Sequence, residues 1–174
     1  MSAVVPINRL KGRILGLVGF GSIPQGVVPK AHAFGIKTIA ADPYVSDEVF
    51  TKLDVERVDF DQLLERADFI SIHTPLTEDT KNLFGQKAFK QMKPEALLVN
   101  AVRGPLVDID AQALVAGEIA GAALDVLPQE PPPDDCPLFG RDDIILTPHT
   151  GFYSTDALLD LQTTVATDVA SVLN

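Results

Sequence analysis

The chain has 174 residues, 46% of them apolar, which is enough for one globular domain with a substantial core. Its 14 basic and 24 acidic residues give a formal net charge of −10, which disfavours nucleic acids and anionic membrane surfaces as partners. The apolar runs are far shorter than a membrane span, and the first residues lack the pattern of a secretory signal. The single cysteine, Cys136, excludes an internal disulfide and a multi-cysteine zinc site, so we expect a cytosolic protein without a bound metal.

Short runs of aliphatic and β-branched residues alternate with longer amphipathic stretches. Continuous apolar runs of this length are typical of strands that are buried on both faces of a parallel sheet, and they lie at residues 14–20, 38–42, 69–73, 97–101, 121–126 and 144–147. Helical patterns lie at 59–67, 85–92, 108–117 and 154–174, the last with Ser154 as its expected N-cap. This alternation predicts an α/β fold with a doubly wound parallel sheet, and the lack of a linker predicts a single domain over 1–174.

Residues 19–35, GFGSIPQGVVPKAHAFG, follow the first predicted strand. Gly19 would allow a tight turn, and Gly21 would allow a phosphate to approach the free N–H groups at the start of the next helix. Asp42 follows Gly21 by 21 residues, at the end of the next strand, where a carboxylate could bind the adenosine ribose. Its charge would repel a 2′-phosphate, so we expect NAD rather than NADP as cofactor. Taken alone, however, the Asp42-Pro43 pair would be only a turn that ends a strand.

Two prolines and a glycine interrupt the helix that we expect after this turn. Pro24 replaces a third glycine, but in the first turn of a helix that begins near Ser22 it removes no helix hydrogen bond. Gly26 costs roughly 1 kcal/mol relative to alanine, and Pro29 costs about 3 kcal/mol in a helix interior. We therefore expect the first helix to be kinked or shifted, and we expect Pro29 to weaken cofactor binding.

Six segments, in order over about residues 9–160, carry a recognisable pattern: LKGRILGLVGFGSI, AFGIKTIAADPYVSDE, ISIHTPLTEDTKNLF, MKPEALLVNAVRGPLVD, GEIAGAALDVLPQEPPP and IILTPHTGFYS. They resemble the D-isomer-specific 2-hydroxyacid dehydrogenase family, and DPYVSDE and PHTGFYS are most similar to its C-terminal-binding-protein-like branch. The resemblance implies a Rossmann-type domain with NAD as cofactor and hydride transfer between NAD(H) and a small 2-hydroxy or 2-keto acid. It also implies a homodimer.

The resemblance assigns three residues to catalysis. Arg103 would bind the carboxylate and carbonyl of the substrate, for which a guanidinium offers a two-pronged fit. His149 would be the general acid/base, and Glu130 would pair with it and hold its orientation. Each of the three alone would be an ordinary loop residue. Their order, each beyond the end of a buried strand, favours a site at the carboxyl edge of the sheet.

The resemblance also implies contacts with the cofactor. Asp125 would lie near the nicotinamide carboxamide. The other expected contacts are Gly19, Gly21, Ser22 and Ile23 in the phosphate turn, Asp42 at the ribose, Thr74, Pro75 and Thr80 beside the adenosine and phosphates, and Ala101, Val102, Arg103, His149 and Gly151 on the nicotinamide side. We assign no chemistry to His73, His32 or Cys136.

The chain departs from the family pattern at the glycine helix, at a slightly shortened helix over 108–117, and in lacking the family's separate substrate domain. We expect the helix at 154–174 to return to that domain. Two hypotheses stay open. The first is the nucleotide-binding domain of an NAD-dependent dehydrogenase, weak or inactive alone; the second is a non-catalytic NAD-binding or corepressor-like interaction module, or an inactive fragment. The sequence does not identify the 2-hydroxy acid.

Overall fold

The computed structural model describes residues 8–109 and 117–173, so most of the helix predicted over 108–117 lies outside the described residues. The described elements alternate between strands and helices along the chain. In order they are β1 (Ile14–Val18), α1 (Ser22–Ala33), β2 (Lys37–Ala41), α2 (Asp47–Lys52), β3 (Glu56–Arg57), α3 (Phe60–Arg66), β4 (Phe69–Ile72), α4 (Gln86–Gln91), β5 (Leu97–Asn100), the 3₁₀ helix η1 (Gly104–Leu106), β6 (Gly121–Leu124), β7 (Ile144–Leu146) and α6 (Thr155–Leu173).

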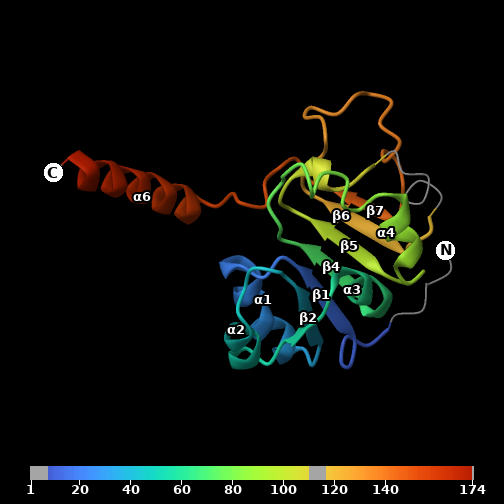
Figure 1. Ribbon diagram of the computed structural model, residues 1–174. Coiled ribbons are helices and arrows are strands. Elements are labelled where there is room, and N and C mark those ends of the chain that lie inside the picture. The colour runs from blue at the N-terminus through green and yellow to red at the C-terminus, as the bar shows by residue number, and fades with distance from the viewer. Residues whose placement is uncertain (1–7, 110–116, 174) are drawn as a thin grey trace.

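Seven strands form one sheet in the order β3-β2-β1-β4-β5-β6-β7 (Figure 1). Every pairing is parallel, and β1 lies between β2 and β4, with Leu17 opposite both Ala40 and Ser71. The chain therefore builds the sheet outward from β1 in both directions. This arrangement confirms the predicted doubly wound, Rossmann-type α/β fold.

Hydrophobic clusters cover both faces of β1. A Cβ atom at Gly16 would lie 2.7 Å from the Leu63 side chain of α3, so one face packs closely against this helix. The next residue, Leu17, belongs to a second cluster with Val28 of α1 and Phe50 of α2. Because successive side chains of a strand point to opposite faces, the two clusters lie on opposite sides of the sheet. Both faces are therefore buried near the point where the strand order reverses.

Helix α1 starts where the sequence predicted. It begins at Ser22, and Pro24 is buried in its first turn. The helix continues through Gly26 and Pro29 to Ala33, so neither residue ends it. A kink at Pro29 stays a prediction.

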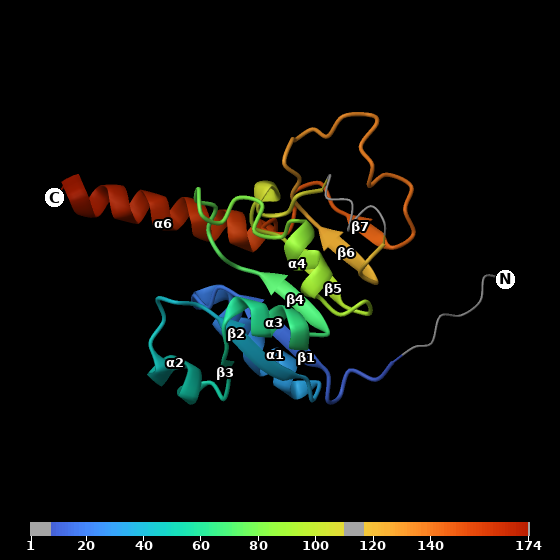
Figure 2. The ribbon, with the colours of Figure 1, turned by 45° about the vertical axis from the view of Figure 1, so that its right-hand side comes forward.

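Helix α6 extends away from the sheet, and none of its residues is buried (Figure 1, Figure 2). Ser154 caps it, since the Ser154 hydroxyl accepts a hydrogen bond of 2.9 Å from the Ala157 N–H, which confirms the predicted N-cap. Within residues 8–109 and 117–173, no helix combines the length and the apolar character that crossing a membrane requires.

Candidate functional site

The glycine turn after β1 depends on Gly19. Its φ is +87°, a left-handed conformation that favours glycine, and a Cβ atom there would lie 2.8 Å from the His73 carbonyl carbon and from the Thr74 nitrogen. The Gly19 N–H donates a hydrogen bond of 2.9 Å to the Ala41 carbonyl. The turn is thus packed between the ends of β2 and β4, and another residue at this position would displace one of them.

Gly21 serves a different purpose from Gly19. Its φ is −73°, which any residue can adopt, and a Cβ atom there would meet no protein atom within 4 Å. It is exposed, and its carbonyl accepts the first bond of α1, from the Gln25 N–H at 3.2 Å. The N–H groups of Ser22 and Ile23 therefore precede the first intrahelical bond and are available to an anion. These features fit the phosphate of a dinucleotide, because the space beside Gly21 is free of protein atoms and lies next to the available N–H groups.

Asp42 connects the end of β2 to the glycine turn. One carboxylate oxygen accepts a bond of 2.7 Å from the Phe20 N–H. The other accepts bonds from the N–H groups of Tyr44, at 2.8 Å, and Val45, at 3.2 Å. Asp42 therefore organises the turn that ends β2, as expected from the Asp42-Pro43 pair alone. Carboxylate oxygens have further lone pairs, so the same group can also accept from ribose hydroxyls.

A cavity of about 850 Å³ lies beside these residues, beyond the ends of β1, β2 and β4. Of the residues predicted to contact the cofactor, those that line it are Gly19, Gly21, Asp42, Thr74, Pro75 and Thr80. The Thr80 hydroxyl donates to the Pro75 carbonyl at 2.7 Å and accepts from the Thr77 N–H at 2.7 Å, which holds this part of the wall together. The sequence analysis missed other lining residues, among them Tyr44, Arg57, Asp59, Phe60 and His73.

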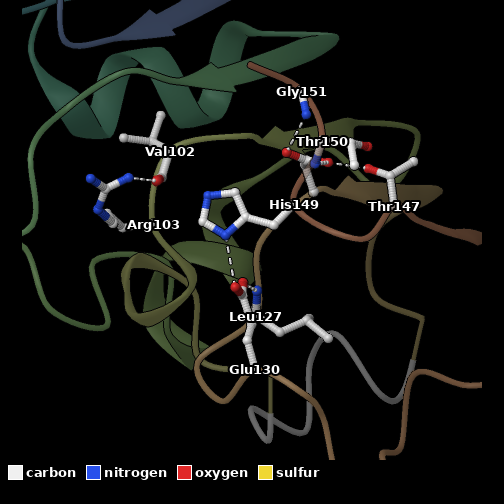
Figure 3. A network of polar contacts seen from close by, with 9 residues as sticks. Val102, Arg103, Leu127, Glu130, Thr147, His149, Thr150 and Gly151 are labelled. Carbon is white, nitrogen blue, oxygen red and sulfur yellow. Dashed lines mark hydrogen bonds and ion pairs between the residues drawn. The ribbon is translucent and has the colours of Figure 1, made fainter. Parts of the chain in front are cut away.

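A second group of predicted residues lies beyond β5, β6 and β7. The His149 Nδ1 atom is 2.7 Å from the Glu130 carboxylate (Figure 3). Since a carboxylate only accepts, Nδ1 carries the proton and Nε2 is left to face a substrate. The hydrogen bond from His149, together with one from the Leu127 N–H, lowers the pKa of Glu130, so this carboxylate is ionised at neutral pH. The pair thus has the geometry of an oriented acid/base.

The backbone at His149 is also constrained. Its φ is +55°, a conformation that residues other than glycine seldom adopt, and its N–H donates to the Asp125 carbonyl at 2.9 Å. Such a conformation persists only where surrounding contacts hold it in place, and it is found most often at functional sites.

Arg103 lies on the other side of the imidazole from Glu130, and Nε2 of His149 points toward that side (Figure 3). Its guanidinium donates to the Val102 carbonyl at 2.6 Å and is otherwise exposed. The buried Asn100 side chain holds this segment, since it donates to the Arg103 carbonyl at 2.9 Å and accepts from the Val102 N–H at 3.1 Å. The sequence analysis did not assign a role to Asn100. A buried amide at the end of an apolar strand was the available signal.

Asp125 anchors the loop that carries His149. Its buried carboxylate accepts hydrogen bonds from the Thr147 hydroxyl at 2.5 Å, the Thr150 N–H at 2.9 Å and the Gly151 N–H at 2.8 Å. Burial alone would raise the pKa of Asp125, but these three donors bring it below its ordinary value. The expected contact with a nicotinamide carboxamide stays a prediction, and the geometry adds a positioning role.

The remaining predicted residues lie beside this anchor. A Cβ atom at Gly151 would be 2.9 Å from the Asp125 carboxylate and 3.7 Å from the Ala101 side chain. Ala101, Val102 and Gly151 therefore lie at the same edge of the sheet as Asp125. The two groups of residues together follow the carboxyl ends of β1, β2, β4, β5, β6 and β7.

Comparison with known proteins identifies the family. Residues 2–151 match the family model described as D-isomer specific 2-hydroxyacid dehydrogenase, NAD binding domain. The chain is 44% identical over 168 residues to D-3-phosphoglycerate dehydrogenase of Methanocaldococcus jannaschii, covering 95% of this chain and 32% of that protein. It is 43% identical over 150 residues to glyoxylate reductase of Thermococcus litoralis, covering 85% of this chain and 45% of that protein.

Solved structures give the same result. The NAD complex of a D-isomer specific 2-hydroxyacid dehydrogenase from Lactobacillus delbrueckii ssp. bulgaricus superimposes with a TM-score of 0.87 at 35% identity, over 96% of this chain and 56% of that one. A glyoxylate reductase from Paecilomyes thermophila superimposes with a TM-score of 0.90 at 28% identity, over 99% and 53%. The chain thus spans between about a third and just over half of these relatives. It belongs to the family of D-isomer specific 2-hydroxyacid dehydrogenases, and the part of that family that it contains is the NAD binding domain.

Proposed function

We propose that this chain binds NAD(H) and carries the catalytic residues for hydride transfer between NAD(H) and a small 2-hydroxy or 2-keto acid. The observation that carries the proposal is the 2.7 Å contact between His149 Nδ1 and Glu130, with Arg103 on the other side of the imidazole (Figure 3). An acid/base and a carboxylate-binding cation beside a dinucleotide cavity are what this reaction requires.

The cavity beyond β1, β2 and β4 would hold the adenosine and pyrophosphate. The N–H groups of Ser22 and Ile23 would bind phosphate oxygens, and the Asp42 carboxylate would accept from the ribose hydroxyls. Thr74, Pro75 and Thr80 would form the opposite wall. Ala101, Val102, Asp125 and Gly151 would lie beside the nicotinamide.

When bound, the nicotinamide ring supplies or accepts the hydride. His149 would donate its Nε2 proton to the keto oxygen during reduction and would take the hydroxyl proton during oxidation. Glu130 would stabilise the positive charge of the protonated imidazole and keep its orientation. Arg103 would bind the substrate carboxylate. One of its N–H groups is used by Val102, and the guanidinium has five such donors in all.

A second candidate for the chain by itself is an NAD-binding module without turnover. The His149 and Glu130 side chains are 44% and 38% exposed, so water reaches the reacting centre. A wet, open site neither orients a substrate nor strengthens electrostatic interactions with it. We therefore propose that 1–174 forms the dinucleotide-binding domain, that α6 leads to a substrate domain which completes the site, and that the protein is a cytosolic homodimer.

Calorimetric titration with NADH and steady-state assays with a panel of 2-keto acids test both candidates. The dehydrogenase requires NADH binding and turnover that disappears in His149→Ala. His32→Gln is the matched control, since His32 of α1 bonds to Thr38 of β2 at 2.9 Å and does not line the cavity. NADH binding without turnover favours the second candidate. Turnover that survives His149→Ala refutes the mechanism, and no binding at millimolar NADH refutes both candidates.

A further inference from the structure

Arg57, at the end of β3, lines the same cavity as Asp42. Its Nη2 atom donates to the Asp42 carbonyl at 3.1 Å, and its Nη1 atom lies 2.5 Å from the Asp47 carboxylate. The guanidinium carbon is 5.3 Å from the centre of the Phe50 ring. These contacts hold a positive charge beside the residue that would bind the adenosine ribose.

Arg57 is the one lysine or arginine among the described residues that line the cavity, whereas three aspartates line it, Asp42, Asp59 and Asp79. The Asp42 carboxylate is fixed in place by three backbone N–H groups. The Arg57–Asp47 pair is far looser, since the Asp47 side chain is 82% exposed. An exposed ion pair of this kind contributes little to stability, so Arg57 can exchange Asp47 for an anionic ligand at small cost.

We propose that Arg57 weakens the preference for NADH over NADPH that Asp42 is expected to give the cavity, an inference that rests on the proposed function. The two cofactors differ by a phosphate on the 2′-oxygen of the adenosine ribose. Asp42 accepts from the free 2′-hydroxyl and repels a phosphate there, whereas a neighbouring arginine favours the phosphate. The preference for NADH therefore depends on the negative charge of Asp42, and the cation that weakens this preference is already in place.

The first test compares Arg57→Met with Arg66→Met in the 174-residue chain. Arg66 is a matched control, because it forms an exposed pair with Glu56 at 2.6 Å and does not line the cavity. The measured quantity is the ratio of the dissociation constants of NADPH and NADH. Arg57→Met should raise this ratio by about fivefold or more, whereas Arg66→Met should leave it unchanged. If Arg57 only supported the fold of the loop, both cofactors would weaken equally and an unchanged ratio would overturn the inference.

The second test replaces Asp42 with asparagine, which keeps an oxygen for the Tyr44 N–H and removes the charge. The ratio should fall by about tenfold, and adding Arg57→Met should reverse much of that fall. An unchanged ratio in folded Asp42→Asn also overturns the inference, and should this variant not fold, the comparison of Arg57→Met with Arg66→Met decides alone. A wild-type chain that binds neither cofactor refutes the proposed function itself. If the chain binds NADH but Arg57→Met leaves the ratio of the NADPH and NADH dissociation constants unchanged, only the role of Arg57 is refuted.

Discussion

Replacing Asp125 with asparagine should loosen the loop that carries His149 and lower the stability of the domain. The buried carboxylate accepts three hydrogen bonds, from the Thr147 hydroxyl and from the N–H groups of Thr150 and Gly151. Asparagine has nearly the same shape, but one of its two oxygens becomes an NH₂ group. Because all three neighbours donate, at least one of them then faces another donor and loses its acceptor.

The size of the effect follows from the contacts. A hydrogen bond to a charged group contributes about 1.5–3 kcal/mol, and a buried donor left without an acceptor costs about 1–3 kcal/mol. The two losses overlap, so we expect the free energy of unfolding to fall by about 2–4 kcal/mol at pH 7. This is a large share of the roughly 5–15 kcal/mol by which a domain is stable. In a complete enzyme, the displacement of His149 should also reduce turnover, and by a larger factor than it reduces the affinity for NADH.

The pH dependence has a definite sign. The pKa of Asp125 is lowered in the folded protein, so its contribution is present above its pKa in the unfolded chain and is lost as the pH falls through its folded pKa. Urea denaturation at pH 7 and at steps below pH 4 (about the unfolded pKa) should show the difference between wild type and Asp125→Asn shrinking with acid. Asp134→Asn, at an exposed aspartate of the proline-rich loop, is the control. Equal midpoints for wild type and Asp125→Asn at pH 7 would refute the anchoring role.

Three further substitutions test the fold that supports the site. Gly19→Ala would place a Cβ atom 2.8 Å from the His73 backbone at a residue with a left-handed φ. The free energy of unfolding should fall by about 2–5 kcal/mol, and NADH binding should be lost. A wild-type urea midpoint or a wild-type calorimetric titration with NADH would contradict this. Pro29→Ala, exposed within α1, should gain about 2 kcal/mol and raise the melting temperature; an unchanged melting temperature would show that the proline does not strain the helix. Asp68→Asn weakens the bond of 2.8 Å from the Ile14 N–H and should cost about 1–3 kcal/mol at pH 7. Burial alone would raise the pKa of Asp68, but its hydrogen bonds lower it, so the loss should shrink as the pH falls; a loss in urea denaturation that is independent of pH would contradict this.

The sequence was sufficient to predict the strands that carry apolar runs, but not to predict β3 at one edge of the sheet. All six strands predicted from continuous apolar runs are present. Their expected burial on both faces was wrong for β5, where Leu97 and Val99 are 39% and 40% exposed, and for β7, where Ile145 is 65% exposed. Strand β3 was missed because it consists of two exposed charged residues, Glu56 and Arg57, which pair with β2 through the backbone. Helix α2 was missed although it is as long as α4, which the pattern over 85–92 did predict; α2 buries only Phe50 and so shows no repeated apolar position.

The same distinction applies to the site. Residues that end buried strands, such as Asp42 and His149, could be placed together from the sequence because the carboxyl ends of parallel strands share one edge. Asn100, Arg57 and Thr147 were missed because they act through carbonyl groups or across loops, and these contacts depend on how the loops fold. The closer similarity to the C-terminal-binding-protein-like branch stays a prediction, since it depends on two short segments alone.

The residues at the start of α1 have separable roles, which explains how a nucleotide turn can persist with a proline in place of its third glycine. Gly19 satisfies backbone packing, and Gly21 leaves space beside the helix start. Pro24 is buried, so the fold accommodates its ring at the position where a third glycine would allow close packing of helix and strand. What the proline removes is one N–H donor of the first turn, and a phosphate must then depend on the N–H groups of Ser22 and Ile23. The effect of this substitution should therefore fall on phosphate affinity and not on helix formation.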